Sequence, residues 1–390
     1  MIQHLKLRNF RSIRELDLEL RPLNVLIGRN ASGKSNFLSF FQVVGDGIRG
    51  NLNAAIVSEI GGFHYLRHLN ADAKETVQWQ LTFDSSHSEK LRYETVIGQR
   101  GQTGSYIVQS EILSKPPNPG HDTWHKFLEV RDGRVALLTT PKGDEEDETT
   151  DNLDQELAIA QIRNPARYPA LAEAFGYMRS WTVFNGFGEK ELRNIRAPQV
   201  VNVVNPLRLA PDGSNLVSLL WALQNQAQYE ATYERLEEVM TTVFPDFKRF
   251  DMQVVAAAQA SLSFRSADLS ASVPAFLMSD GQLRFLGLVI LLLLPNSPDL
   301  ILIDEPEIGM HPKMIDVFAE LLKEASKRTQ IIVATHSPQL IDSMNTEDLM
   351  IVERDNGETS IRRPDMQKLQ LWLERYSPGY LWTHTTLLEG

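Results

Sequence analysis

The sequence of 390 residues predicts an α/β fold with an antiparallel β-lobe at the N-terminus, a mostly parallel core sheet and an inserted helical lobe. Three observations support this prediction. Apolar and polar residues alternate over residues 2–20, which is typical of half-buried strands. An unbroken apolar run at 23–27, interpreted as the third strand of a β-meander over the first thirty residues, has the pattern of a central strand buried on both faces and leads into a helical pattern at 34–44. A strand–helix–strand pattern covers 300–334, and such units give parallel strands with a right-handed crossover.

The remaining elements follow from the same periodicities. Strand patterns cover residues 76–83 and 91–97. Helical periodicity dominates from 157 to 240, most clearly at 216–223 and 229–243, and a fully apolar helix is expected at 285–294. Near the C-terminus, strands at 349–352 and 359–362 flank an Asp-Asn-Gly turn, so they form a hairpin.

Composition excludes several classes of protein. The chain has no cysteine, so it has no disulfide framework, thiolate zinc site, iron–sulfur cluster or cysteine nucleophile. Its net charge of −11 argues against a surface that is basic throughout for nucleic acid, although a local strip is still compatible with it. The most apolar run, residues 286–294, is shorter than the roughly 20 residues that cross a bilayer. We therefore expect a cytoplasmic protein without a membrane partner.

The strongest motif is Gly28-Arg29-Asn30-Ala31-Ser32-Gly33-Lys34-Ser35, which matches G-x-x-x-x-G-K-[ST] between a buried strand and a helix. In such a loop, the glycines let backbone N–H groups turn toward phosphates, and the helix N-terminus adds partial positive charge. Lys34 would reach the β- and γ-phosphate oxygens, and the Ser35 hydroxyl would bind Mg²⁺. The motif predicts a site for ATP and Mg²⁺.

Two carboxylates follow the apolar strand at 300–303. Asp304 and Glu305 would lie at the carboxyl end of a parallel strand, which is where open α/β sheets bind ligands. Asp304 can hold Mg²⁺ through water, and Glu305 can polarise the attacking water. Capping of the next helix is the alternative for such a pair. Next to a phosphate-binding loop, the catalytic interpretation is favoured.

Two further segments are candidates for phosphate contacts. His336 follows the strand at 331–334, where its imidazole can hydrogen-bond a γ-phosphate. Ser279 and Gly281 precede the buried helix at 285–294, and a serine hydroxyl beside a helix N-terminus can bind an anion. We interpret the pair His64 and His68 as structural, because it lacks a third metal ligand.

The order of these motifs resembles the ABC-type ATPase head, and more narrowly the RecF/SMC/OLD-like prokaryotic AAA family ATPase group. The resemblance rests on LKLRNFRSI before the P-loop, IDEPE-x-G-x-HP at 303–312, ATHSPQLID from residue 334 and LAPDGSNL at 209–216. It covers residues 1–44 and 206–352 and leaves 45–205 loosely assigned.

In that family two heads enclose ATP, and each head offers its signature segment to the nucleotide bound by the other. The resemblance implies that Ser279, Gly281 and Gln282 contact the γ-phosphate in trans. It makes Glu305 and His336 catalytic and assigns Mg²⁺ to Ser35 and Asp304. Nucleotide contacts within one head are then assigned to Gly28, Asn30, Gly33, Lys34, Ser35, Asn36 and Arg11. The family's Q-loop glutamine has no single counterpart, and Gln42, Gln78 and Gln80 are the candidates.

The resemblance also suggests how the chain is divided. Residues 1–100 and 260–390 would form one discontinuous ATPase head, and 101–259 an inserted, largely helical lobe with an acidic loop near 144–156. No heptad pattern persists long enough for a coiled coil. After the histidine motif about fifty residues remain, which is too few for the TOPRIM nuclease domain of OLD-type proteins.

We therefore expect an ATPase, converting ATP and water to ADP and phosphate, that acts as a molecular switch. It would dimerise head to head around two ATP, as a homodimer or higher oligomer, and control a separately encoded nuclease or toxin in phage defence or DNA maintenance. The alternative is a RecF-like DNA-binding repair ATPase. Its basic candidates are Arg163, Arg167, Arg179, Lys190, Arg193 and Arg196.

Overall fold

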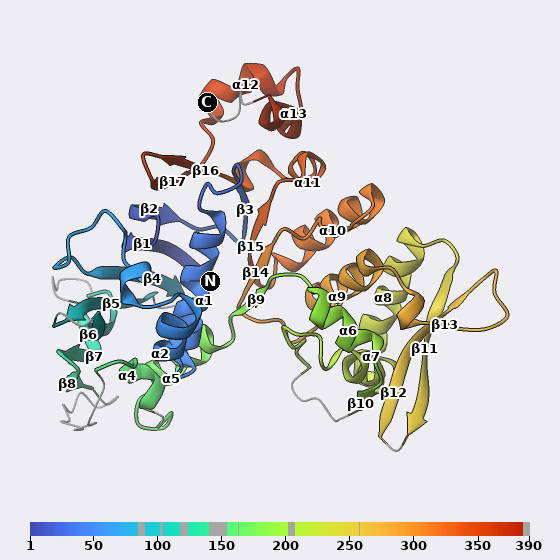
Figure 1. Ribbon diagram of the computed structural model, residues 1–390, viewed down its shortest axis with the longest axis horizontal. Coiled ribbons are helices and arrows are strands. Elements are labelled where there is room, and N and C mark those ends of the chain that lie inside the picture. The colour runs from blue at the N-terminus through green and yellow to red at the C-terminus, as the bar shows by residue number, and fades with distance from the viewer. Residues whose placement is uncertain are drawn as a thin grey trace. The chain divides into compact units, whose positions relative to one another are not determined.

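The computed structural model describes residues 1–84, 90–101, 104–117, 124–139, 154–162, 164–201, 207–256 and 258–384 (Figure 1). The chain divides into two compact units. The first unit contains Met1–Pro22, Gly28–Trp181 and Met350–Arg363. The second unit contains Leu23–Ile27, Thr182–Leu349 and Pro364–Gly390. Both units are therefore built from segments that lie far apart in the sequence.

A seven-stranded antiparallel sheet dominates the first unit. Its order is β2-β1-β4-β5-β6-β7-β8. The strands are β1 (Ile2–Phe10), β2 (Ile13–Glu19), β4 (Val77–Asp84), β5 (Lys90–Arg100), β6 (Ser105–Lys115), β7 (His125–Arg131) and β8 (Arg134–Leu138). Apolar residues share one face because side chains alternate along each strand; for example, Leu5 pairs with Leu18 on one side and Leu81 on the other.

Helix α1 (Lys34–Ile48) covers this apolar face. The ring of Phe40 meets Phe10 of β1 and Trp79 of β4 edge to face, with centroid distances of 5.6 and 5.9 Å. The unit also contains α2 (Leu52–Ala54), the π-helix η1 (Ala55–Glu59), α3 (Phe63–Leu66), α4 (Ala158–Gln161), α5 (Pro169–Arg179) and, apart from Leu349, the hairpin β16 (Leu349–Asp355) and β17 (Glu358–Arg362). Strand β17 lies beside β2.

The core of the second unit is a parallel sheet in the order β3-β15-β14-β9. Its strands are β3 (Leu23–Ile27), β9 (Thr182–Phe184), β14 (Leu300–Asp304) and β15 (Gln330–Thr335). Every residue of β3 and β15 is buried, as expected of parallel strands covered on both faces. Helix α10 (Pro312–Ala325) connects β14 to β15, so the predicted strand–helix–strand unit is confirmed.

The rest of the second unit is mixed. Its helices are α6 (Glu189–Arg196), α7 (Leu216–Asn225), η2 (Ala227–Tyr229), α8 (Glu230–Val243), η3 (Ala275–Leu277), α9 (Asp280–Leu293), α11 (Pro338–Asp342), η4 (Thr346–Asp348), α12 (Met366–Leu373) and α13 (Pro378–Thr383). A small antiparallel sheet contains β10 (Gln199–Val200), β11 (Phe247–Ala256), β12 (Gln259–Ser266) and β13 (Val273–Pro274). No helix in the described part of the chain is long and apolar enough to cross a membrane.

The predicted α/β fold, with an antiparallel N-terminal sheet and a mostly parallel core, is confirmed. Two details differ from the sequence predictions. Strand β3 does not continue the β1–β2 meander, because it pairs in parallel with β15. Residues 105–138 contain three strands, whereas we expected a largely helical lobe from residue 101. Of the acidic loop at 144–156, only 154–156 fall among the described residues, and the division into head and lobe stays a prediction.

Candidate functional site

The P-loop, residues 28–35, connects β3 to α1. Gly33 is the N-cap of α1 and has a φ of +111°, a conformation that glycine adopts without strain. No side chain among the described residues caps this helix, and its first turn carries no acidic residue. Lys34 is 5% exposed and donates from Nζ to the carbonyl oxygens of Gly28 and Arg29, at 2.8 and 3.2 Å. The loop therefore presents a lysine and the positive end of a helix to an anion.

The hairpin β16–β17 contacts this loop through Thr359. Thr359 is 3% exposed, and its Oγ1 donates to the carbonyl oxygen of Ser32 at 2.9 Å. A Cβ on Gly33 would lie 2.1 Å from the same hydroxyl, so only glycine fits here. Thr359 Oγ1 also hydrogen-bonds Ser12 Oγ at 2.7 Å, and Ser12 Oγ accepts from Asn36 Nδ2 at 2.7 Å. The P-loop, the β1–β2 turn and the first turn of α1 thus share one hydrogen-bond chain.

A cavity of about 290 Å³ adjoins the first turn of α1. Arg11 and Asn36, both predicted as nucleotide contacts, line it together. Arg11 donates to Ser39 Oγ at 3.1 Å, and burial lowers the pKa of its guanidinium. The other eight lining residues were not predicted as nucleotide contacts: Ser12, Ile60, Tyr65, His68, Leu69, Asn70, Arg354 and Gly357. The lining contains apolar side chains such as Leu69 and polar ones such as Asn70, and beside a phosphate-binding loop such a mixture suits a flat, heterocyclic base.

The second unit carries the predicted catalytic pair. The backbone N–H of Glu305 donates to the carbonyl oxygen of Ala334 at 2.9 Å, which extends the β14–β15 ladder. His336 comes directly after β15, and its Nε2 lies 3.3 Å from Glu305 Oε1. Asp304 ends β14 and pairs in register with Ala334. The structure therefore brings Asp304, Glu305 and His336 together at the carboxyl edge of the parallel sheet.

The signature segment starts helix α9. Ser279 is the N-cap: its Oγ accepts from Gln282 N, and Gln282 Oε1 accepts from Ser279 N at 2.8 Å, which makes a capping box. Close packing requires glycine at position 281, because a Cβ on Gly281 would lie 2.0 Å from the carbonyl oxygen of Gly309. The signature and the loop at 309–312 are thus in direct backbone contact.

Asn185, an amide residue at the carboxyl edge of the parallel sheet, was not singled out from the sequence. Strand β9 pairs in parallel with β14, with Phe184 opposite Ile303, so Asn185 leaves its strand at the same level as Asp304. Asn185 is exposed. In the sequence, Asn185 follows residues 182–184, and a segment of three residues is too short to predict a strand.

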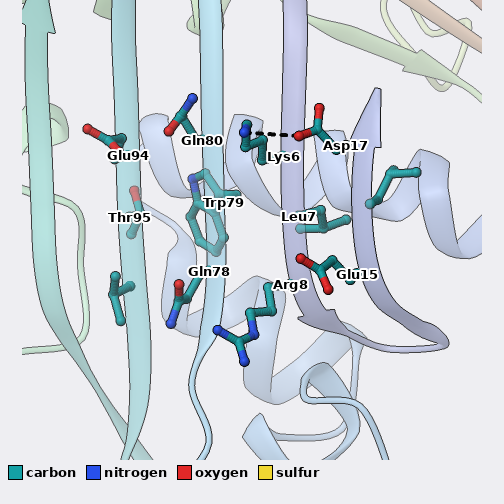
Figure 2. A pocket seen from close by; sticks show the side chains of 12 residues that line it. Lys6, Leu7, Arg8, Glu15, Asp17, Gln78, Trp79, Gln80, Glu94 and Thr95 are labelled. Carbon is teal, nitrogen blue, oxygen red and sulfur yellow. Dashed lines mark ion pairs between the residues drawn. The ribbon is translucent and has the colours of Figure 1, made fainter. Parts of the chain in front are cut away.

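The three glutamines that we considered for the Q-loop lie elsewhere in the first unit. Gln78 and Gln80 alternate with Trp79, whose ring packs on α1, so their side chains point to the opposite face of the sheet. Both line a hollow of about 300 Å³. In Figure 2, Gln80 lies beside Lys6 and Gln78 lies beside Arg8. Gln42 donates to Glu59 Oε2 at 3.0 Å.

The basic residues proposed for DNA contact are in part already engaged. Arg193 forms an ion pair with Glu189 at 3.2 Å. Arg196 forms an ion pair with Asp280 and donates to the carbonyl oxygen of Met278 at 2.9 Å. Arg163 lies outside the described residues. Each pair neutralises one positive charge among the six basic candidates.

Comparison with protein families gives one match that spans most of the chain. A family model described as "AAA domain, putative AbiEii toxin, Type IV TA system" matches residues 23–342. The chain is 22% identical over 416 residues to an OLD nuclease of Thermus scotoductus, covering 97% of this chain and 68% of that protein. It is 26% identical over 139 residues to a retron Ec83 probable ATPase of Escherichia coli, covering 33% and 24%.

Solved structures of Smc heads share the fold. One is an SmcHead bound to the C-winged helix domain of ScpA, with a TM-score of 0.56, 15% identity and coverage of 94% of this chain and 99% of that one. Another is an Smc head domain with an extended coiled coil, bound to the C-terminal domain of ScpA derived from Pyrococcus furiosus. Its TM-score is 0.54 at 14% identity, with coverage of 96% and 98%. The α/β fold therefore resembles that of an SMC-type ABC ATPase head.

Proposed function

Because the chain belongs to the family described as AAA domain, putative AbiEii toxin, Type IV TA system, we propose that it is an ATP-hydrolysing switch that controls a partner protein. One observation carries the proposal. Glu305 pairs with His336 at the carboxyl ends of β14 and β15, and the P-loop begins where the adjoining parallel strand β3 ends. The phosphate-binding loop and the water-activating carboxylate thus follow β3 and β14, two parallel strands of one sheet with β15 between them.

The residues of the P-loop fit a triphosphate. The glycines are fixed by close packing, and the buried Ser32 Oγ has no hydrogen-bond partner among the described residues. We assign the phosphates to Lys34 and the N-terminus of α1, with Gly28, Asn30 and Gly33 shaping the loop. Arg11 and Asn36 would hold the base or ribose in the adjoining cavity.

Hydrolysis then needs a metal and a base. Ser35 and Asp304 are the residues that would hold Mg²⁺, and the ion would neutralise part of the phosphate charge. In this assignment Glu305 orients and deprotonates the attacking water, and His336 donates a hydrogen bond to the γ-phosphate. Asn185, at the level of Asp304, is the amide that would take the place of the Q-loop glutamine.

Dimerisation would complete the site. Ser279, Gly281 and Gln282 lie at the start of α9, beside Phe276 and Leu277, which are 64% and 66% exposed. Such exposed apolar side chains favour a protein contact at this face. We assign the contact to a second copy, whose signature would meet the bound ATP. Likeness to an OLD nuclease and a retron ATPase supports a role in phage defence with a nuclease or toxin effector.

Phosphate release by the purified protein tests the proposal. Glu305→Gln should bind ATP with wild-type affinity, hydrolyse it at least a hundredfold more slowly because the general base is lost, and dimerise in ATP. Lys34→Ala should not bind ATP. Glu320→Gln on α10, which removes the same charge from an exposed ion pair, is the matched control and should behave as wild type. Wild-type hydrolysis by Glu305→Gln would refute the assignment of the base, and absence of ATP binding by the wild type would refute the function.

A further inference from the structure

Glu307 connects the two loops that carry the catalytic pair. It lies two residues after Glu305, and its Oε1 accepts three hydrogen bonds. The donors are Thr335 Oγ1 at 2.8 Å, His336 N at 2.7 Å and Ser337 N at 3.0 Å. One carboxylate oxygen therefore holds three consecutive residues at the end of β15.

These three hydrogen bonds to Glu307 Oε1, called the clamp below, fix the backbone of His336. The imidazole Nε2 lies 3.3 Å from Glu305 Oε1, so a small rotation of the backbone at His336 would open that contact. Glu305 itself has a φ of +47°, which is costly for a residue with a side chain and needs support from its surroundings. Glu305 is thus held in a conformation that its backbone would not adopt unaided.

The charge of Glu307 strengthens the clamp. Hydrogen bonds from backbone N–H groups to a carboxylate are shorter and stronger than those to a neutral acceptor. The other oxygen, Oε2, is buried and has no hydrogen-bond partner among the described residues. The cost of burying this carboxylate is offset chiefly through Oε1, that is, through the segment that contains His336.

We propose that Glu307 is a positioning residue, which holds His336 against Glu305 so that the pair can act in ATP hydrolysis. The inference rests on the proposed ATPase function, because the pair has a reaction to perform only there. Among the described residues, the side chain of Glu307 forms hydrogen bonds only with Thr335, His336 and Ser337. Its loss should therefore affect turnover and leave nucleotide binding intact.

Two variants separate the clamp from simple packing. Glu307→Ala removes the acceptor, and we expect kcat to fall more than tenfold while the Kd for a fluorescent ATP analogue changes less than twofold. Glu307→Gln keeps an amide oxygen that can accept the same N–H groups, so kcat should recover to within a few-fold of wild type. In a His336→Ala background, Glu307→Ala should cause little further loss, because the two residues act as one unit.

Hydrogen exchange measures how strongly these amides are held and does not require ATP hydrolysis. Amides of His336 and Ser337 should exchange faster in Glu307→Ala and stay protected in Glu307→Gln, measured by mass spectrometry on a peptide spanning 332–340. Unchanged exchange, full kcat in Glu307→Ala, or additive losses with His336→Ala would each overturn the inference. A wild-type protein that binds no ATP but shows the expected exchange would refute the proposed function and leave the clamp standing.

Discussion

Removing one buried hydroxyl should weaken the P-loop. Thr359→Val keeps the shape of the side chain beneath Gly33 but removes the donor to the Ser32 carbonyl, a bond of 2.9 Å. A buried acceptor left without a donor costs about 1–3 kcal/mol. Ser12 Oγ keeps its bond from Asn36, so its loss is smaller. We expect a decrease of about 2 kcal/mol in the free energy of unfolding.

Thr359→Val should also weaken nucleotide binding. The Ser32–Gly33 peptide would no longer be fixed, and a penalty of about 1.4 kcal/mol on binding corresponds to a tenfold higher Kd. Urea unfolding gives the stability, and titration with a fluorescent ATP analogue gives the Kd. Thr359→Ser, which retains the hydroxyl and loses the methyl group, is the control and should bind ATP nearly as the wild type does. If Thr359→Val binds ATP as tightly as Thr359→Ser, the hydroxyl does not position the loop and the reasoning fails.

Three further predictions concern other parts of the chain. Burial raises the pKa of Glu111 to about 7 from its usual value of 4.5, so the folded state binds the proton more tightly than the unfolded state does. The free energy of unfolding should therefore fall as the pH rises from 4.5 to 7. Urea unfolding at pH 5 and pH 8 measures this fall, which should be smaller in Glu111→Gln. Asn185→Ala should lower kcat at unchanged Kd for ATP while Asn185→Gln retains activity, and full activity in the alanine variant would exclude Asn185 from the reaction. Gly281→Ala should abolish ATP-dependent dimers in light scattering, because its Cβ would lie 2.0 Å from the carbonyl oxygen of Gly309; an intact dimer would contradict this role for the backbone contact.

Local patterns explain which parts of the site could be predicted. The P-loop and the Asp304–Glu305 pair each occupy a few consecutive residues, and their strands are unbroken apolar runs. The placement of His336 near Asp304 followed from parallel strands that share one carboxyl edge, whereas its contact with Glu305 was not predicted.

Long-range pairing explains what was missed. Strand β3 looked like a third meander strand, because its apolar pattern does not specify whether its partner is β2 or the distant β15. The cavity beside α1 combines Arg11, Tyr65 and Arg354, which no local pattern connects. Asn185 acquires its place only from the pairing of β9 with β14, and a single amide after three strand residues carries no signal of its own.

The contact between Ser12 and Thr359 has a consequence for protein synthesis. These hydroxyls are 347 residues apart in the sequence, and Thr359 also bonds the P-loop itself. A nascent chain that carries the complete glycine-rich motif therefore lacks its support until translation has passed the late hairpin. Contacts of such sequence separation form late in folding, because a long loop must close first. A ribosome-bound fragment that ends before Thr359 should therefore bind ATP more weakly than the chain of 390 residues.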